Sequence, residues 1–228
     1  MGEPLADREA QVEAVLDRLA ETYPDATISL AFETRLELLV AVILSAQCTD
    51  ERVNRVTEEL FEKYRSAEDY AAADQDELAD DIGSITYFNQ KAGWIREACQ
   101  RLVDEHGGEV PDTMDELTAL PGVGRKTANV VLQHGHDVVE GIVVDTHVMR
   151  LSRRLGLTER SSRDAIERDL MDVVPRRRWT QFTHLLIAHG RATCTARNPD
   201  CESCVVEDRC PSSRLDAEID LASGERWA

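Results

Sequence analysis

Lysine is nearly absent from this chain of 228 residues. Only Lys63, Lys91 and Lys126 are present, and the other 23 of the 26 basic residues are arginines. Acidic residues number 44, so the formal net charge is −18, which argues against a protein that binds nucleic acid over its whole surface. A lysine-poor, acid-rich surface suits a cytoplasm of very high salt, where charge repulsion is screened. The composition therefore predicts a halophilic source.

Long apolar runs are lacking as well. The most apolar stretch covers residues 36–46, which is too short to span a membrane, and residues 1–13 are acidic and show no secretory signal. A cytoplasmic protein without a membrane partner is expected. Because thiols stay reduced in the cytoplasm, the six cysteines predict a metal site or buried thiols and not disulfides.

Acidic residues are missing from four windows, which cover residues 82–96, 117–136, 146–158 and 176–199. The last window contains the run Arg176 to Arg178, and the third contains Arg150, Arg153 and Arg154. If the windows meet in space, they form a neutral or positive face that can bind a polyanion despite the acidic total.

The pattern of apolar residues is helical throughout, and no strand alternation appears. Apolar residues recur at helical spacing in segments near 5–19, 32–46, 50–64, 70, 78, 89–106, 145–155, 161–173 and 178–189. Asp50 is expected to cap the helix that follows it. The sequence therefore predicts an all-α fold.

The stretch Pro121-Gly122-Val123-Gly124 lies between two short amphipathic segments in the middle of the chain. Glycine tolerates positive φ and leaves the backbone amides uncovered, and a helix starting near Gly124 adds its positive dipole end. The turn is therefore predicted to hold a phosphate, with Lys126, Asn129 and Gln133 on one polar helix face. A plain helical corner with a solvated lysine is the alternative.

Four cysteines fall within 17 residues near the C-terminus: Cys194, Cys201, Cys204 and Cys210, spaced x6, x2 and x5. So short a loop with few large apolar residues needs a metal to order it, and the spacing leaves zinc and [4Fe-4S] both open. Cys48 and Cys99 occur singly in apolar helices and are interpreted as buried thiols.

Three further residues have both a structural and a functional interpretation. Asp145 is an expected helix N-cap and is also a possible acid–base partner for Lys126. Gln47 follows a helix and Tyr87 lies in a turn, and such positions are commonly structural.

His147, His184 and His189 show no metal-ligand spacing and are interpreted as packing residues.

These motifs, taken in order, resemble endonuclease III among the helix-hairpin-helix DNA glycosylases. The resemblance rests on the stretches Leu44 to Gln47, Leu120 to Val131, Val144 to His147 and the cysteine set. It implies a six-helix lobe over residues 28–138 that carries the hairpin. It also implies a discontinuous lobe of residues 1–27 and 139–228, with a [4Fe-4S] loop at 194–210 and an acidic tail. A halophilic archaeal source fits the composition.

The resemblance also implies a function, namely removal of oxidised pyrimidines in base excision repair by a DNA glycosylase with AP lyase activity. Lys126 would attack C1′ and form a Schiff base, β-elimination would nick the strand, and Asp145 would handle protons. The DNA contacts would come from Gln47, Tyr87, Gly122, Gly124, Arg125 and Thr127. The partner would be double-stranded DNA with damaged bases or abasic sites, bound by a monomer associated with the nucleoid.

One departure and two alternatives accompany this interpretation. The family usually has Gly-Leu where this chain has Thr86-Tyr87, which puts the wedge assignment in question. An adenine-mismatch glycosylase shares Asp145 and the cluster, but it normally lacks the lysine at position 126 and has an extra C-terminal domain. A non-catalytic DNA-binding or redox-sensing module would leave the pair Lys126 and Asp145 unexplained.

Overall fold

A computed structural model describes residues 5–215 of the chain, and the expected acidic tail lies largely outside this range. The described part contains only helices and irregular segments, with no strand, so the prediction of an all-α fold is confirmed. It divides into two compact units, one formed by residues 1–27 and 141–228 and the other by residues 28–140. They are called unit 1 and unit 2 here.

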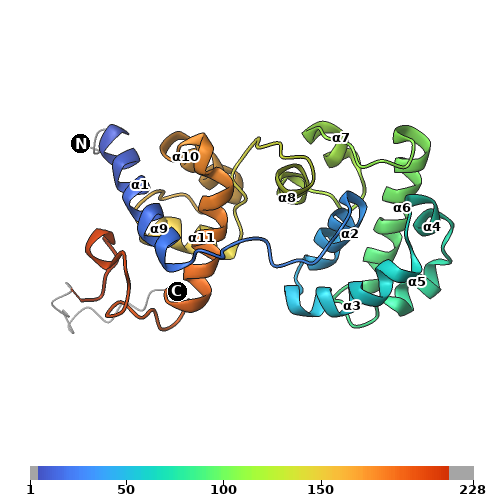
Figure 1. The fold of residues 1–228 in the computed structure, drawn as a ribbon, viewed down its shortest axis with the longest axis horizontal. Helices are drawn as coiled ribbons and strands as arrows, with labels where there is room; N and C mark the ends of the chain where they lie inside the picture. Colours follow the sequence, from blue (N-terminus) through green and yellow to red (C-terminus); the bar gives the residue numbers. More distant parts are fainter. Residues whose placement is uncertain (1–4, 216–228) are drawn as a thin grey trace. The chain divides into compact units, whose positions relative to one another are not determined.

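Unit 2 is a bundle of helices packed around one apolar core (Figure 1). Its helices are α2 (Arg35–Ser45), α3 (Asp50–Lys63), α4 (Ala67–Ala72), α5 (Gln75–Asp81), α6 (Phe88–His106), α7 (Met114–Ala119) and α8 (Arg125–Gly135). The helix α6 packs on α4, α5 and α2, and α2 also packs on α3 and α8. Every residue of α2 from Leu38 to Leu44 is buried, so this helix is apolar on all sides and forms the centre of the core.

The ends of these helices follow from local chemistry. A capping box begins α2, where the Thr34 side chain accepts from the Glu37 amide and the Glu37 carboxylate accepts from the Thr34 amide. The cap of α3 is Thr49, whose hydroxyl accepts from the amide of Arg52. Asp50 is the first residue of that helix, so its predicted capping role was wrong. Gly107, with φ of 63°, ends α6.

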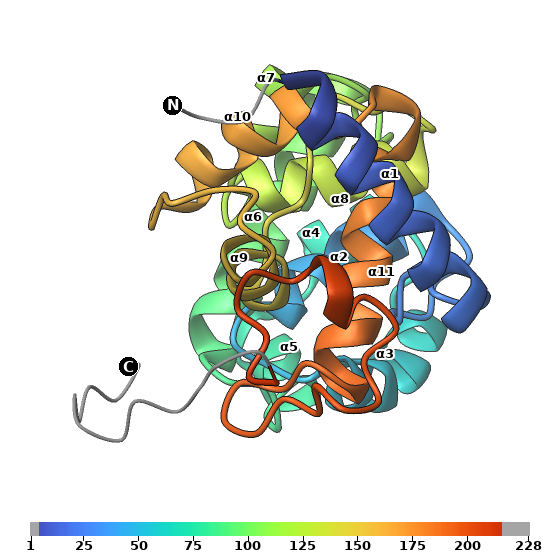
Figure 2. The same cartoon turned by 90° about the vertical axis from the view of Figure 1, so that its left-hand side faces the viewer.

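Unit 1 combines the two ends of the chain. Its helices are α1 (Leu5–Thr22), α9 (Thr146–Arg154), α10 (Arg163–Val173) and α11 (Trp179–Ala192), with short 3-10 turns η1 (Arg176–Arg178) and η2 (Glu207–Arg209). The helix α11 packs on α9 and α1, and α1 also packs on α10 (Figure 2). Across residues 5–215, no helix has the length and apolar character that crossing a membrane requires.

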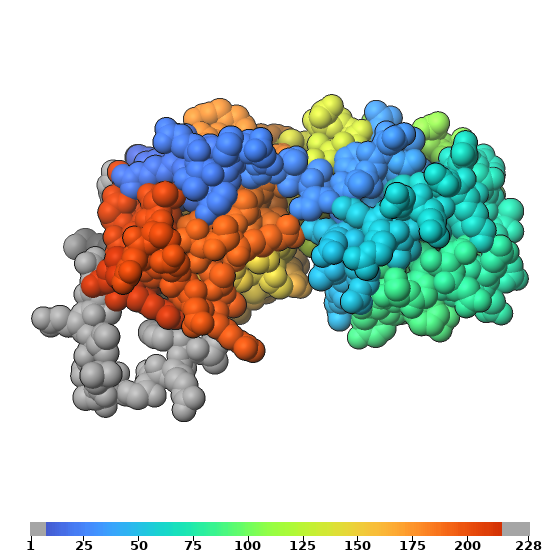
Figure 3. All heavy atoms as spheres, turned by 60° about the horizontal axis from the view of Figure 1, so that its bottom comes forward, coloured from blue at the N-terminus to red at the C-terminus, as the bar shows by residue number. Residues whose placement is uncertain are grey.

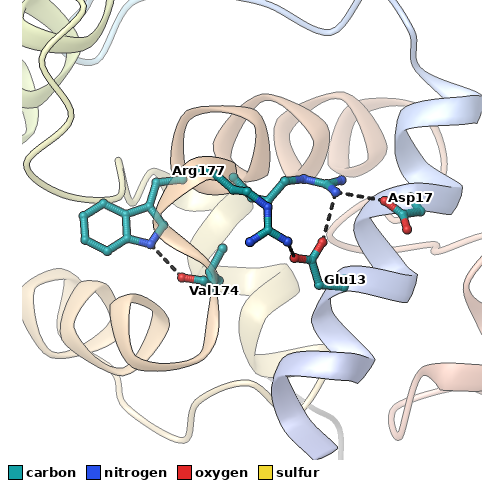
Figure 4. Close-up of polar contacts among 6 residues, drawn as sticks. Glu13, Asp17, Val174 and Arg177 are labelled. Carbon is teal, nitrogen blue, oxygen red and sulfur yellow. Dashed lines mark hydrogen bonds and ion pairs between the residues drawn. The ribbon is translucent and has the colours of Figure 1, made fainter. Parts of the chain in front are cut away.

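Two of the three arginines of η1 form ion pairs within unit 1. Arg177 pairs with Glu13 of α1, and Arg178 binds both Glu13, at 3.0 Å, and Asp17, at 2.9 Å (Figure 4). The Arg178 side chain is only 17% exposed. These ion pairs join η1 to α1 and give two of the three arginines acidic partners within unit 1, while the Arg177 side chain stays 72% exposed.

Candidate DNA-repair site and cysteine cluster

The central hairpin connects α7 to α8 through the five residues 120–124. The carbonyl of Leu120 accepts from the amide of Val123 at 3.1 Å, which closes the turn, and the carbonyl of Gly124 accepts from Ala128 at 2.9 Å as the first bond of α8. Gly124 is the N-cap of α8 and no side chain caps this helix end. The amides of its first turn therefore face outward at the positive end of the helix dipole, as an anion site requires.

The two glycines of the turn differ in what they require. Gly122 has a φ of 77°, and a Cβ there would lie 3.0 Å from the Cβ of Trp94, so both conformation and packing demand glycine. Gly124 has an extended φ of −93°, and a Cβ there would meet nothing within 4 Å. Packing within the protein does not explain the second glycine, whereas the need for an uncovered amide does.

This contrast gives a prediction for two variants of the hairpin. Gly122→Ala is expected to destabilise the fold by about 1–2 kcal/mol, through left-handed strain and the contact with Trp94, and to lower Tm by several degrees. Gly124→Ser is expected to leave Tm unchanged or slightly higher, because serine is a good N-cap. Its hydroxyl would occupy the amides, so affinity for duplex DNA should fall about tenfold. Thermal melts and fluorescence anisotropy on both variants check this, and unchanged affinity in Gly124→Ser would contradict a phosphate site here.

Lys126 and its neighbours lie on the first turn of α8. Arg125 and Lys126 are exposed and Thr127 is half-buried. In the part of the chain that the structure describes, no hydrogen bond or ion pair engages the Lys126 amine. Asn129 and Gln133 are 1% and 5% exposed, so the part of the predicted polar helix face that they form is buried, while Lys126 on the first turn is exposed. The lysine therefore stands alone beside the hairpin amides.

Asp145 begins α9 in unit 1. Its carboxylate accepts from the amide of Val148 at 2.7 Å, so the predicted N-cap role is confirmed. The carboxylate is half-buried, because the preceding apolar run from Ile142 to Val144 is packed inside. One hydrogen bond to the amide of Val148 leaves this carboxylate with acceptor capacity for a second partner.

Gln47 and Tyr87 share an unusual backbone conformation in unit 2. Gln47 follows α2 with φ of 55°, and Tyr87 precedes α6 with φ of 60°, which is the left-handed region that side chains other than glycine rarely occupy. Both side chains are exposed, that of Tyr87 to 57%. Strain of this kind in exposed polar or aromatic residues is characteristic of positions held for a function.

The four cysteines lie together in unit 1. Cys194, Cys201, Cys204 and Cys210 are half-buried and line one cavity, along with residues of α9, α11 and the loop itself. The loop follows α11 and is fastened to α1, where Arg18 pairs with Asp208 and Gln11 donates to the Arg209 carbonyl at 3.1 Å (Figure 3). Only Val206 of the loop is deeply buried. The loop therefore has almost no apolar core of its own, as the sequence indicated.

The four thiols meet the donor set of a metal centre. Lining one cavity together, they supply the four thiolate ligands that either a [4Fe-4S] cluster or a tetrahedral zinc ion requires. Burial raises the pKa of Cys204 and Cys210, and the positive charge of a bound metal centre would favour their thiolate forms.

Two side chains beside the cysteines were missed in the sequence. Arg154 of α9 donates to the Cys194 sulfur at 3.1 Å. His189 of α11 lies with Nε2 3.6 Å from the Cys204 sulfur, while its Nδ1 is 3.1 Å from the Tyr23 hydroxyl. Burial lowers the pKa of His189 to about 4, so the imidazole is neutral near pH 7. The acid-free window around Arg154 was the available signal. His189 was interpreted as a packing residue and is 2% exposed, but nothing in the sequence placed it beside the cysteines.

Comparisons with known proteins agree with this geometry. The HhH-GPD superfamily of base excision DNA repair proteins matches residues 40–176, and the iron-sulfur binding domain of endonuclease III matches residues 194–210. The chain is 49% identical to endonuclease III of Synechocystis sp. over 92% of this chain and 96% of that one. Endonuclease III of Bacillus subtilis is 45% identical over 88% and 91% of the two chains.

Solved structures show the same relationship. A non-covalent endonuclease III–DNA complex and a trapped endonuclease III–DNA covalent intermediate each superpose with a TM-score of 0.86 at 45% identity, covering 91% of this chain and 97% of theirs. The hairpin, the lone lysine and the cysteine set thus define a helix-hairpin-helix protein of base excision DNA repair with an iron–sulfur cluster. The chain belongs to the endonuclease III family.

This membership confirms the main sequence interpretation. The chain is a base excision repair enzyme with the DNA glycosylase and AP lyase activities of its family, and its cofactor is a [4Fe-4S] cluster. Cys194, Cys201, Cys204 and Cys210 would hold the cluster, whose iron–thiolate bonds tie the loop together when it is bound. The halophilic source stays a prediction.

Proposed function

We propose that this enzyme removes oxidised pyrimidines from double-stranded DNA, and also acts at abasic sites, as a monomer that uses Lys126 as the nucleophile and Asp145 as the acid–base residue. The observation that supports this most strongly is the exposed, unengaged amine of Lys126 on the same helical turn as the uncovered amides after Gly124. A phosphate on those amides would bring a deoxyribose next to the amine.

The chemistry follows from those two groups. The target base leaves the stack, because its glycosidic bond is inaccessible inside the duplex. The Lys126 amine then forms a bond to C1′ as the bond to the base breaks, and Asp145 accepts the proton that the amine releases. The departing base takes a proton from water. Asp145 then returns its proton to O4′ as the C1′–O4′ bond breaks, which opens the sugar ring and leaves a Schiff base between Lys126 and C1′. This Schiff base acidifies the hydrogen on C2′, whose removal expels the 3′ phosphate and nicks the strand.

The other proposed DNA-contacting residues form two groups, one that would bind the phosphate backbone and one that would contact the bases. Gly122, Gly124, Arg125 and Thr127 would contact the phosphate backbone, since they surround the exposed start of α8. Gln47 would fill the space that the displaced base leaves, and Tyr87 would stack beside it. An exposed aromatic ring can stack on any base, which makes the tyrosine a reasonable substitute for an aliphatic wedge.

Borohydride trapping on a set of duplexes tests the proposal. Reduction is expected to give a covalent protein–DNA adduct with thymine glycol and with an abasic site, and none with undamaged DNA or an A·G mismatch. Repeating the binding assays across potassium chloride concentrations should show log affinity falling linearly with log salt. An adduct formed with none of the duplexes, together with tight binding, would support a non-catalytic DNA-binding module instead, and adenine release from the mismatch would support the mismatch glycosylase.

A further inference from the structure

Lys91 is a buried charged residue to which the proposed mechanism gives no role. Its side chain is 1% exposed within the core of unit 2, on the first turn of α6. Burial lowers its pKa, and within residues 5–215 no carboxylate pairs with it. By contrast, Lys63 is a surface residue that pairs with Glu77 and Asp81. A buried lysine without a counter-ion is costly and calls for a specific reason.

The ammonium of Lys91 binds the end of α2. Its Nζ donates to the carbonyl of Leu44 at 2.8 Å and to the carbonyl of Ala46 at 2.6 Å. Carbonyls at a helix C-terminus lack partners within the helix, and the negative dipole end attracts a cation. The two bonds fix the direction in which the chain leaves α2, one residue before Gln47.

The backbone of Lys91 also adjoins the second strained position. Its amide donates to the carbonyl of Tyr87 at 3.0 Å, as the first bond of α6. Lys91 therefore makes hydrogen bonds to both places. Its side chain binds the segment that leads to Gln47, and its backbone amide binds the carbonyl of Tyr87. Unit 2 has three exposed non-glycine residues in the left-handed conformation among those described, and the proposed function places two of them, Gln47 and Tyr87, against DNA.

We propose that Lys91 is a positioning residue for the DNA-bound state. Its buried ammonium holds the exit of α2 so that Gln47 stays in register with Tyr87, and the two side chains enter the duplex together. Lysine suits this task because its compact ammonium carries three donors on a flexible stem and can satisfy two carbonyls at once. The inference rests on the proposed function, which assigns Gln47 and Tyr87 to the DNA.

The test uses 2-aminopurine placed opposite a tetrahydrofuran abasic analogue in duplex DNA, since its fluorescence rises when it is unstacked. Lys91→Met keeps the stem and removes the donors, and Lys63→Met is the matched control at the exposed lysine. At saturating protein, Lys91→Met is expected to lose most of the fluorescence change. Its preference for the abasic analogue over undamaged DNA should fall about tenfold, while Lys63→Met behaves like the wild type.

A double variant separates positioning from general structural damage. Gln47→Ala should reduce the fluorescence change to the same degree, and adding Lys91→Met to it should cause little further loss, because both act on one contact. If Lys91→Met does not fold, Lys91→Arg provides the test, since it keeps the charge but its planar group cannot reproduce the geometry at both carbonyls. A normal fluorescence change in whichever variant folds, or additive losses in the double variant, would overturn the inference.

The same assay distinguishes the two hypotheses. Failure of the wild type to prefer the abasic analogue would count against the proposed function itself. A wild type that prefers it, alongside a Lys91 variant that does so equally well, would count against the positioning role alone.

Discussion

Lys126→Ala is expected to abolish both base release and strand nicking, lowering the single-turnover rate on thymine-glycol DNA by about 10³-fold or more, as loss of a covalent nucleophile does. Because residue 126 is exposed on the first turn of α8, stability should change by no more than about 0.5 kcal/mol. DNA affinity should fall only slightly, since the hairpin amides and Arg125 remain. Single-turnover kinetics, a binding titration and a thermal melt measure the three quantities.

Lys63→Ala is a suitable control for Lys126→Ala. It removes an exposed lysine that is ion-paired with Glu77 and Asp81 on the surface of unit 2, so activity should stay at the wild-type level. A Lys126→Ala protein that still forms a borohydride-trapped adduct would show that another amine is the nucleophile. Since the chain has only three lysines and Lys91 is buried, that outcome would leave Lys63 and the N-terminal amine as the candidates to test next.

Cys204→Ser is expected to give a colourless protein in which unit 1 no longer unfolds cooperatively. The cysteine loop has a single deeply buried apolar residue, Val206, so little but the cluster orders it. The loop also carries the contacts of Asp208 and Arg209 with α1, and these should be lost with it. Visible absorption, iron content and limited proteolysis record the change, with unit 2 expected to survive as a protected fragment because its core is its own.

Cys48→Ser serves as the matched control for the cluster variant. Cys48 is a half-buried thiol in unit 2 that packs against the core, away from the cysteine loop in the chain. Its replacement should leave colour and iron content unchanged. A stable, colourless wild-type protein containing one zinc ion would contradict the cluster.

The helices and the hairpin could be predicted because they depend on local rules. Helical spacing of apolar residues located the helices to within a few residues. The turn between α7 and α8 followed from Gly122 and Gly124, and the metal loop from cysteine spacing. The N-cap role of Asp145 could be predicted for the same reason, because capping depends only on the residues at the start of the helix.

The residues that sequence reasoning missed depend on long-range packing. Lys91 binds carbonyls 45 and 47 positions away in the chain, and His189 meets Tyr23 across 166 positions. Helical spacing placed Asn129 and Gln133 on one polar face of α8 with Lys126, but it could not show that packing buries both side chains. Arg177 and Arg178 look like a free basic run until α1 brings Glu13 and Asp17 beside them. Spacing along one helix carries no information about such neighbours.

Unit 1 is formed by two segments that unit 2 separates in the sequence, and this affects how the protein folds during synthesis. Residues 28–140 form one continuous segment, so unit 2 can finish its core while the ribosome is still extending the chain. The apolar side of α1, with Val12, Val15, Leu16 and Leu19, has no α11 to cover it until synthesis passes residue 192, a delay on the order of ten seconds. During that interval the nascent chain exposes the apolar side of α1. Iron can be inserted only after residue 210 has emerged from the ribosome. The order of translation thus delays both the covering of α1 and the loading of the cofactor.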